Sequence, residues 1–165
     1  MTIRASLVRH PAFMAVMLLS GLALLIALSA QKPRGQAATK RVIHMSAVEY
    51  KGTTTVDKEP FPGTAPPPGG GYVLKPPVDG KWETSTYRFE PGFIVVNKHD
   101  DVELNIWGVN GDKHETLIEG FDVKFVVKRG QLTKVGFHAG KSGMFRIVCD
   151  NHKPSMVAWL VVLEG

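Results

Sequence analysis

The C-terminal part of the chain carries side chains that bind soft metal ions. Cys149, His152 and Met156 lie within the eight-residue run Cys149-Asp-Asn-His-Lys-Pro-Ser-Met156. Cys149 is the only cysteine, so the chain cannot form an internal disulfide. A thiolate beside an imidazole and a thioether is the donor set that copper selects. With one more histidine, for which His114 is well placed, the pattern predicts a copper site.

The spacing of these residues suggests how they could meet. Cys149 closes an apolar run that begins at Met144, and a second apolar run begins at Val157, so the residues between must turn. One loop can then present the sulfur, the imidazole and the thioether to a common point. His114 follows the turn 108–113, which can lie at the same end of a β-sandwich. Two histidines, a cysteine and a weak axial methionine are the ligands of a mononuclear electron-transfer copper.

Taken singly, each ligand candidate has an ordinary structural interpretation. A lone cysteine is usually a small buried hydrophobe, and a lone methionine is usually part of a core. Glu115 or Asp150 adjoins the candidates and could replace Met156, which would harden the site and move it away from electron transfer. Only the combination of the four residues favours copper.

The other histidines and the tryptophans are assigned elsewhere. His99 lies in a charged turn and is interpreted as solvated, and His138 as a surface residue. His44 alternates with Val42 and could face either side of its strand, whereas His10 precedes the long apolar run. Trp107 and Trp159 are interpreted as core aromatics, although an aromatic near copper can lie on an electron path.

From residue 41 onward the sequence indicates an all-β domain. A first strand is predicted at 41–50, and residues 58–80 are predicted to be one long loop because they contain seven prolines and five glycines. Short apolar or β-branched runs separated by turn residues follow, a spacing typical of a β-sandwich. The predicted strands are 82–89, 93–96, 102–107, 116–118, 123–127, 132–137, 144–149 and 157–163.

The N-terminal part is predicted to associate with a membrane. Residues 12–30 run for 19 residues without a charge, close to the length that crosses a bilayer as a helix. We favour a retained single-pass anchor with residues 1–11 in the cytoplasm, residues 31–40 as a tether and residues 41–165 as an exported domain. A cleaved signal peptide, with the cleavage site near Ala27-Leu-Ser29, remains the alternative. Both interpretations place the domain on the periplasmic side of the plasma (inner) membrane if the N-terminus stays inside.

The charge distribution argues against nucleic acid as a partner. The chain has a net charge of +5, with 20 Lys and Arg against 15 Asp and Glu. Five of the basic residues and none of the acidic ones fall in residues 1–40, so the remainder is neutral. Basic residues beside a membrane segment favour anionic headgroups. The excess of positive charge therefore indicates a membrane-proximal segment and not a nucleic-acid-binding face.

Residues 85–165 resemble the cupredoxin superfamily. The segment Phe89-Glu-Pro-Gly-Phe-Ile-Val-Val-Asn-Lys-His-Asp-Asp-Val-Glu-Leu-Asn105 is similar to its strand–turn–strand region. His114-Glu-Thr-Leu-Ile-Glu-Gly-Phe121 matches the segment with the first histidine ligand, and Ala139-Gly-Lys-Ser-Gly-Met-Phe-Arg-Ile-Val-Cys149 resembles the strand that enters the copper loop. The resemblance implies a Greek-key β-sandwich that follows the predicted N-terminal transmembrane helix.

Within this superfamily the sequence pattern most resembles that of the copper domains of cytochrome oxidase subunit II and nitrous oxide reductase. Those domains hold two coppers between two cysteines, whereas this chain has one cysteine and a shorter loop. The resemblance therefore implies one copper ion held by His114, Cys149, His152 and Met156. The His-to-Met spacing also differs from that of many small blue copper proteins.

These observations lead to a functional hypothesis with named rivals. The leading one is an exported, membrane-anchored copper protein that relays single electrons between redox proteins, as a free carrier or within a cytochrome- or oxidase-type complex. The second is storage or delivery of copper for assembly of a copper enzyme, and the third is a structural domain that binds no metal. An enzymatic role with a small-molecule substrate ranks last, because the sequence shows no catalytic triad, carboxylate pair or phosphate-binding loop.

Overall fold

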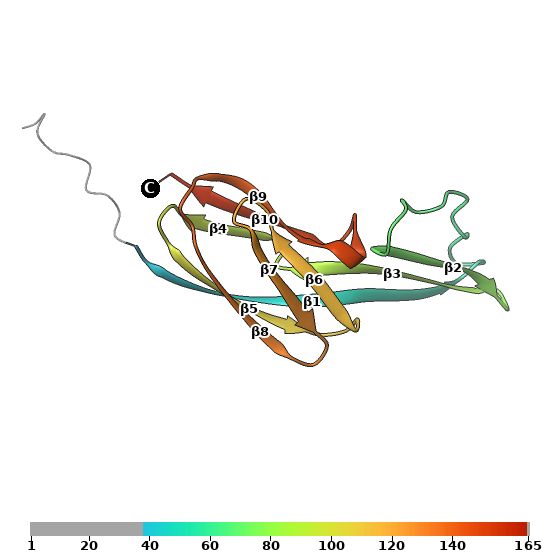
Figure 1. Cartoon of the computed structure of the whole chain (residues 1–165). Helices are drawn as coiled ribbons and strands as arrows, with labels where there is room; N and C mark the ends of the chain where they lie inside the picture. Colours follow the sequence, from blue (N-terminus) through green and yellow to red (C-terminus); the bar gives the residue numbers. More distant parts are fainter. Residues whose placement is uncertain (1–37, 165) are drawn as a thin grey trace, which may run out of the picture. The chain divides into compact units, whose positions relative to one another are not determined.

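A computed structural model describes residues 38–164 and folds them into two five-stranded β-sheets (Figure 1). The strands are β1 (Lys40–Thr55), β2 (Tyr72–Val78), β3 (Lys81–Glu90), β4 (Phe93–Asn97), β5 (Asp101–Gly108), β6 (Lys113–Ile118), β7 (Val123–Lys128), β8 (Leu132–His138), β9 (Gly143–Cys149) and β10 (Val157–Leu163). One 3-10 turn, η1 (Asp150–His152), separates β9 from β10. No α-helix occurs in this described part of the chain.

The sheet topology is that of a Greek-key sandwich. The first sheet has the order β2-β3-β1-β5-β8 and the second has the order β4-β10-β9-β6-β7. β1 pairs antiparallel with β3 and parallel with β5, and β10 pairs antiparallel with β9 and parallel with β4. The chain crosses between the sheets from β3 to β4, from β4 to β5, from β5 to β6, from β7 to β8 and from β8 to β9. This confirms the predicted all-β sandwich.

Alternating side chains form the core between the two sheets. Successive residues of a strand point to opposite faces, so every second residue can face the partner sheet. Leu104 and Ile106 of β5 are fully buried, as are Ala158 and Leu160 of β10. Both sheets therefore meet across an apolar interior, and Cys149 and Met156 belong to the same buried cluster.

The prediction that residues 58–80 form one loop is wrong for residues 72–78. Residues 72–78 form β2, which pairs with β3 as an edge strand. Pro76 and Pro77 fit there because an edge strand does not need every backbone N–H, and the pairing is irregular between Lys75 and Val78. Composition alone overestimated how strongly proline excludes a strand.

The strand β1 is longer than expected, and its second half forms a separate feature. It runs to Thr55 instead of ending at Tyr50, because residues 46–55 pair continuously with β3. β2, residues 49–55 of β1 and residues 81–86 of β3 together form what we call the three-stranded extension. Figure 1 shows that this extension continues beyond the strands of the second sheet. One of its faces therefore lacks a partner sheet.

The interpretation of Trp107 and Trp159 as core residues is wrong. Trp107 is 48% exposed and Trp159 is 41% exposed. Both lie on the outward phase of their strands, since Ile106 and Leu160 beside them are fully buried. The two-residue period of the strand thus overrides the general preference of tryptophan for the interior.

The predicted membrane anchor, residues 12–30, lies outside the described residues, as does most of the tether. In residues 38–164 no helix is long and apolar enough to span a bilayer. Lys40, which was assigned to the tether, is the first residue of β1. The domain thus begins one residue earlier than the sequence suggested.

The turn between β4 and β5 provides a prediction about stability and pH. The Asp100 carboxylate is buried and accepts hydrogen bonds from the Asn97 backbone N–H at 2.9 Å and from Arg41 Nε at 3.1 Å. The Asn97 N–H, followed by Arg41, lowers the pKa of Asp100 from its ordinary 3.8. Its stabilising effect is complete above pH 3.8 and is lost as the pH falls through the lower, folded-state pKa. Acid titration of unfolding should therefore show a smaller loss of stability for Asp100→Asn than for the wild type, and equal slopes would contradict this role.

Candidate metal centre

Three strand ends and one turn bring the four predicted ligands to the same region. His114 is the second residue of β6, Cys149 is the last residue of β9, and His152 ends η1. β6 and β9 are neighbours, with Thr116 opposite Cys149. Met156 immediately precedes β10 and is fully buried. The turn predicted between the last two strands is confirmed.

The donor atoms of three of these residues face one another. Nδ1 of His114 lies 3.2 Å from Nδ1 of His152, and Sγ of Cys149 lies 3.3 Å from Nδ1 of His152. The third side of this triangle, from Cys149 Sγ to His114 Nδ1, is 3.9 Å. Donor atoms that each lie about 2.0–2.3 Å from one ion are roughly 3–4 Å apart. The triangle therefore has the dimensions to hold a single metal ion.

A backbone contact fixes which nitrogen of His114 is free. Nε2 of His114 lies 2.8 Å from the carbonyl oxygen of Asn110 and donates its proton there. Nδ1 thus carries the lone pair and points into the triangle. The Asn110 side chain in turn bonds both the backbone N–H and the carbonyl of Glu49 on β1. His114 is therefore held through the 109–112 loop by the first sheet, an arrangement that orients a metal ligand.

The protonation of the site follows from its burial. Burial lowers the pKa of His114 below 6.5, against a smaller opposing effect of the hydrogen bond to Asn110. Burial also lowers the pKa of His152, and the neighbouring His114 adds to that effect. Both imidazoles are thus neutral at pH 7 and can donate lone pairs. Burial raises the pKa of Cys149 above 9.0, although the backbone N–H groups of Asn151 and His152 partly oppose this by bonding to the sulfur.

The carboxylate alternative to Met156 receives no support. The cluster that could hold an ion consists of His114, Cys149 and His152 in the described part of the chain, without an acidic member. Glu115 pairs with Lys113 at 2.6 Å, and Asp150 pairs with Lys153 at 2.7 Å. Met156 lies on the same loop as His152, and its backbone carbonyl accepts a hydrogen bond from the Cys149 N–H. Its assignment as an axial ligand stays a prediction.

The glycine run Gly69–Gly71 packs directly on residues 150–156, which connect β9 to β10 and which we call the ligand loop. The sequence did not suggest this contact. A Cβ atom on any of the three would overlap a backbone oxygen of the loop, on Lys153, Asn151 or His152. Gly71 N–H also donates to the Lys153 carbonyl at 3.1 Å, and the Ser155 hydroxyl donates to the Gly71 carbonyl at 2.6 Å. The first part of the predicted loop 58–80 is therefore a clamp on the residues around His152. No motif marks this role, because it depends on a contact across 80 residues.

Tyr87 is another residue at the site that the sequence analysis did not identify. Its ring stacks on the His152 ring with 3.7 Å between centroids and 22° between planes, and lies 5.7 Å from the His114 ring. Its hydroxyl bonds to the Glu49 carboxylate. Burial, followed by the Glu49 charge, raises the pKa of Tyr87 above 10.0, so the phenol keeps its proton.

The remaining described histidines lie away from the triangle. His138 is half-exposed and pairs with Asp101 at 2.9 Å, which agrees with its interpretation as a surface residue. His99 adopts a φ of 71° in the β4–β5 turn, 5.9 Å from the His138 ring. His44 is exposed on β1. None of them replaces His114.

Gly111 allows a test of how tightly the His114 ring is held. A Cβ at Gly111 would lie 2.7 Å from His114 Cε1, and its φ of 79° disfavours any L side chain. Gly130 has a similar φ of 71° but nothing within 4 Å of the same point. Both Gly→Ala variants should lose about 1–2 kcal/mol of unfolding free energy through the backbone. Only Gly111→Ala should in addition weaken metal binding, measured by titration, and equal metal affinities would show that the ring can yield.

Comparisons with known proteins support the fold. No family model matches the sequence, and no curated protein matches it. Among solved structures, a copper nitrite reductase from Nitrosomonas europaea matches with a TM-score of 0.51 and 16% identity over 76% of this chain and 42% of its own. A multi-copper oxidase from Pseudomonas thermotolerans matches with a TM-score of 0.50 and 14% identity over 78% of this chain and 30% of its own.

The periplasmic domain of cytochrome oxidase subunit II from Bradyrhizobium japonicum is also similar. It shares 26% identity over 43% of this chain and 54% of its own length, with a TM-score of 0.37. The chain thus spans less than two thirds of each of these three structures.

The two broader matches and the strand order show that residues 38–164 have the cupredoxin fold. This confirms the β-sandwich fold that the resemblance implied. The fold carries a triangle of two imidazoles and one thiol that can hold one metal ion, and His114 and Cys149 of this triangle are buried.

Proposed function

We propose that this chain is a mononuclear copper protein that transfers single electrons between redox proteins. The observation that carries the proposal is the triangle of His114 Nδ1, His152 Nδ1 and Cys149 Sγ, with sides of 3.2, 3.3 and 3.9 Å. Imidazole and thiolate donors in this combination suit copper. A single cysteine restricts the site to one ion, because a thiolate-bridged pair of coppers needs a second cysteine.

Copper held here would supply a centre that accepts and releases one electron. The residues of the chain keep its surroundings constant. His114 is fixed by Asn110, Cys149 receives two backbone N–H groups, and the loop that carries His152 is clamped by Gly69–Gly71. Burial of His114, Cys149 and Met156 limits access of water and substrates. A site held in this way from both sheets reorganises little when its charge changes, which suits electron transfer better than catalysis.

The proposal includes a location and a kind of partner. The apolar run 12–30 supports a single-pass anchor in the plasma (inner) membrane, with the copper domain on the periplasmic side. The similarity to subunit II of a cytochrome oxidase supports a partner of the cytochrome or oxidase-complex class.

Optical spectroscopy of the copper-loaded protein tests the proposal. We expect a strong thiolate-to-copper charge-transfer band, one copper per chain, and loss of the band in Cys149→Ser. Lys153→Ala serves as a control that removes an exposed side chain from the same loop and leaves every ligand in place. A wild-type protein that binds copper without this band would not be the electron carrier proposed here.

Copper storage or delivery is the rival function, and the copper-loaded protein can be used to test it as well. A delivery site has to release its ion, whereas two members of the triangle, His114 and Cys149, are buried and the triangle is held by contacts from β1, β6 and the glycine run. Repeated one-electron reduction and oxidation should therefore proceed without loss of copper to a chelator. Release of the ion at each reduction would favour delivery instead.

A further inference from the structure

We propose that Tyr87 is the residue through which electrons pass between the metal site and the three-stranded extension. This inference rests on the proposed function and concerns the route by which the site exchanges electrons. The starting observation is the stacking of Tyr87 on His152, with ring centroids 3.7 Å apart. Rings stacked at this distance, here with 22° between their planes, are in van der Waals contact.

Polar contacts hold the Tyr87 ring and backbone in place. The Ser155 hydroxyl, on the ligand loop, lies 3.0 Å from the Tyr87 carbonyl oxygen, and the Tyr87 N–H donates to Gly71 at 3.1 Å. At the far end of the ring the hydroxyl bonds to the Glu49 carboxylate, whose side chain is only 10% exposed. Tyr87 therefore joins the loop of His152 to β1 and β3 by both its ring and its backbone.

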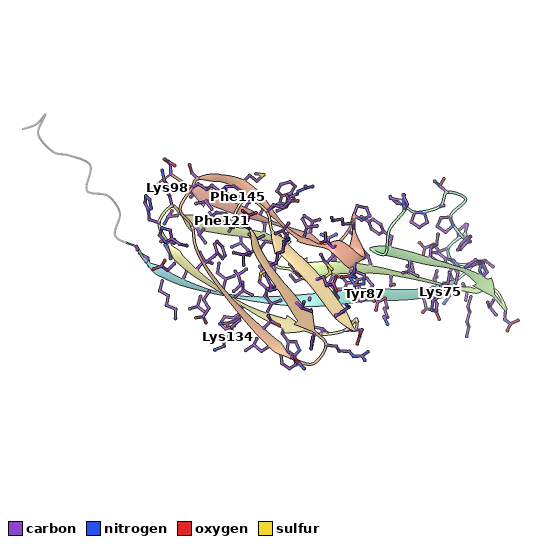
Figure 2. The ribbon with its side chains drawn as sticks, viewed as in Figure 1. Lys75, Tyr87, Lys98, Phe121, Lys134 and Phe145 are labelled. Carbon is purple, nitrogen blue, oxygen red and sulfur yellow. The ribbon has the colours of Figure 1, made fainter. Side chains whose placement is uncertain are left out.

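The extension offers a surface to which this contact leads. Residues of β3 that share the face of Tyr87 are Ser85 and Glu83, which pair across the sheet with Lys51 and Thr53 of β1 and with Val73 and Lys75 of β2. No strand of the second sheet covers this part, and it forms an open hollow of about 230 Å³ beside Glu49. In Figure 2, Tyr87 lies near the turn after β9 and Lys75 lies farther out on the extension.

Among the described residues, burial argues against a direct route from His114 or Cys149 to the surface. His114 and Cys149 are both fully buried, and His152 is the only member of the triangle with a partly exposed side chain. Tyr87 covers one face of that imidazole. Trp107 and Trp159, the other aromatic candidates, point outward from their strands, and among the described residues neither ring stacks on His114 or His152.

The step is a transfer of one electron without proton movement. Copper held by the triangle would supply a one-electron Cu(I)/Cu(II) centre, and a one-electron redox protein docked at the extension would change by one electron in the opposite sense. The Tyr87 hydroxyl is hydrogen-bonded to the Glu49 carboxylate and is not a reactant in this step. The ring acts as a contact that couples the two centres, and the hydrogen bond to Glu49 keeps it oriented.

Intramolecular electron transfer from an attached ruthenium complex tests this route. The complex is bound to a histidine introduced by Lys75→His on the extension, in a full-length background in which His10, His44, His99 and His138 are replaced by glutamine. A second series carries the label at Lys134→His on β8, which belongs to the part of the first sheet away from the extension. Each series is measured with Tyr87, Tyr87→Phe and Tyr87→Leu.

We expect Tyr87→Leu to slow transfer from position 75 by at least about tenfold, with little change from position 134. Tyr87→Phe keeps the stacked ring and should retain most of the rate. Tyr50→Leu, which removes an exposed tyrosine of the extension that does not touch His152, serves as the matched control. Equal rates from position 75 in all variants, or the same loss from both labels, would overturn the proposal.

Two further measurements distinguish a failure of this inference from a failure of the proposed function. The charge-transfer band and the reduction potential of each variant show whether its copper site is intact. If the wild type itself lacks the band, the proposed function is contradicted, and the proposed electron route falls with it. In metal-free protein, the ring protons of His152 should shift upfield in NMR spectra through stacking on Tyr87. That shift should persist in Tyr87→Phe and vanish in Tyr87→Leu, and its absence in the wild type would contradict the contact on which the route depends.

Discussion

Met156→Ala is expected to lower the free energy of unfolding of the metal-free domain by about 2–5 kcal/mol. Met156 is fully buried and belongs to the cluster that joins both sheets. Truncation removes its transfer free energy and leaves a cavity that the rigid loop between η1 and β10 cannot fill. The Met156 backbone also bonds to Cys149 and His152, so the loop has little freedom to collapse. Chemical denaturation of metal-free protein measures the effect.

Met156→Leu separates the packing role of this side chain from its proposed role as an axial ligand. Leucine has nearly the same volume, so the cost should stay below about 1.5 kcal/mol. It has no sulfur, and the copper-loaded variant should therefore show an altered spectrum and a shifted reduction potential. Val162→Ala, in the same core but at the end of β10 remote from η1, provides a control that loses stability and keeps the spectrum. An unchanged spectrum in Met156→Leu would restrict Met156 to the core.

Local patterns predicted the sandwich and the ligand triangle because both depend on short-range features. Alternation of apolar residues marks strands such as β5 and β10, and the turn after Cys149 is implied by the apolar runs on either side of it. The position of His114 was predicted from the turn 108–113 that precedes it. The pairing of β6 with β9 then brings it to Cys149.

Long-range contacts were beyond the reach of such patterns. Gly69–Gly71 appeared to be ordinary loop residues, and their role depends on backbone atoms of 151–153 that approach too closely for any side chain. Tyr87 appeared to be one β-strand residue among many, and its contact with His152 depends on the packing of one sheet against the other. Asn110 likewise shows its importance only through its bonds to Glu49 and His114. Residues that support a site from another sheet leave no periodic signal.

Addition of copper is expected to raise the free energy of unfolding of the wild-type domain by about 4 kcal/mol when free copper exceeds the dissociation constant a thousandfold. The folded chain holds His114, His152 and Cys149 within a few ångströms, whereas the unfolded chain does not. Binding of copper to single unfolded histidines or to the thiol would reduce the gain. Denaturation at buffered copper concentrations, with and without a chelator, measures the difference.

Cys149→Ser and the pH dependence show whether the gain comes from the triangle. Serine is similar in size and fits the buried position, but it offers no thiolate, so the stabilisation by copper should fall sharply. Because the pKa of Cys149 is raised above 9.0, copper must displace the thiol proton at pH 7, and the gain should increase as the pH rises from 6 to 8. The imidazoles add to this trend only below 6.5, where protonation starts to compete with the metal. An equal gain in Cys149→Ser would place the bound copper elsewhere on the chain.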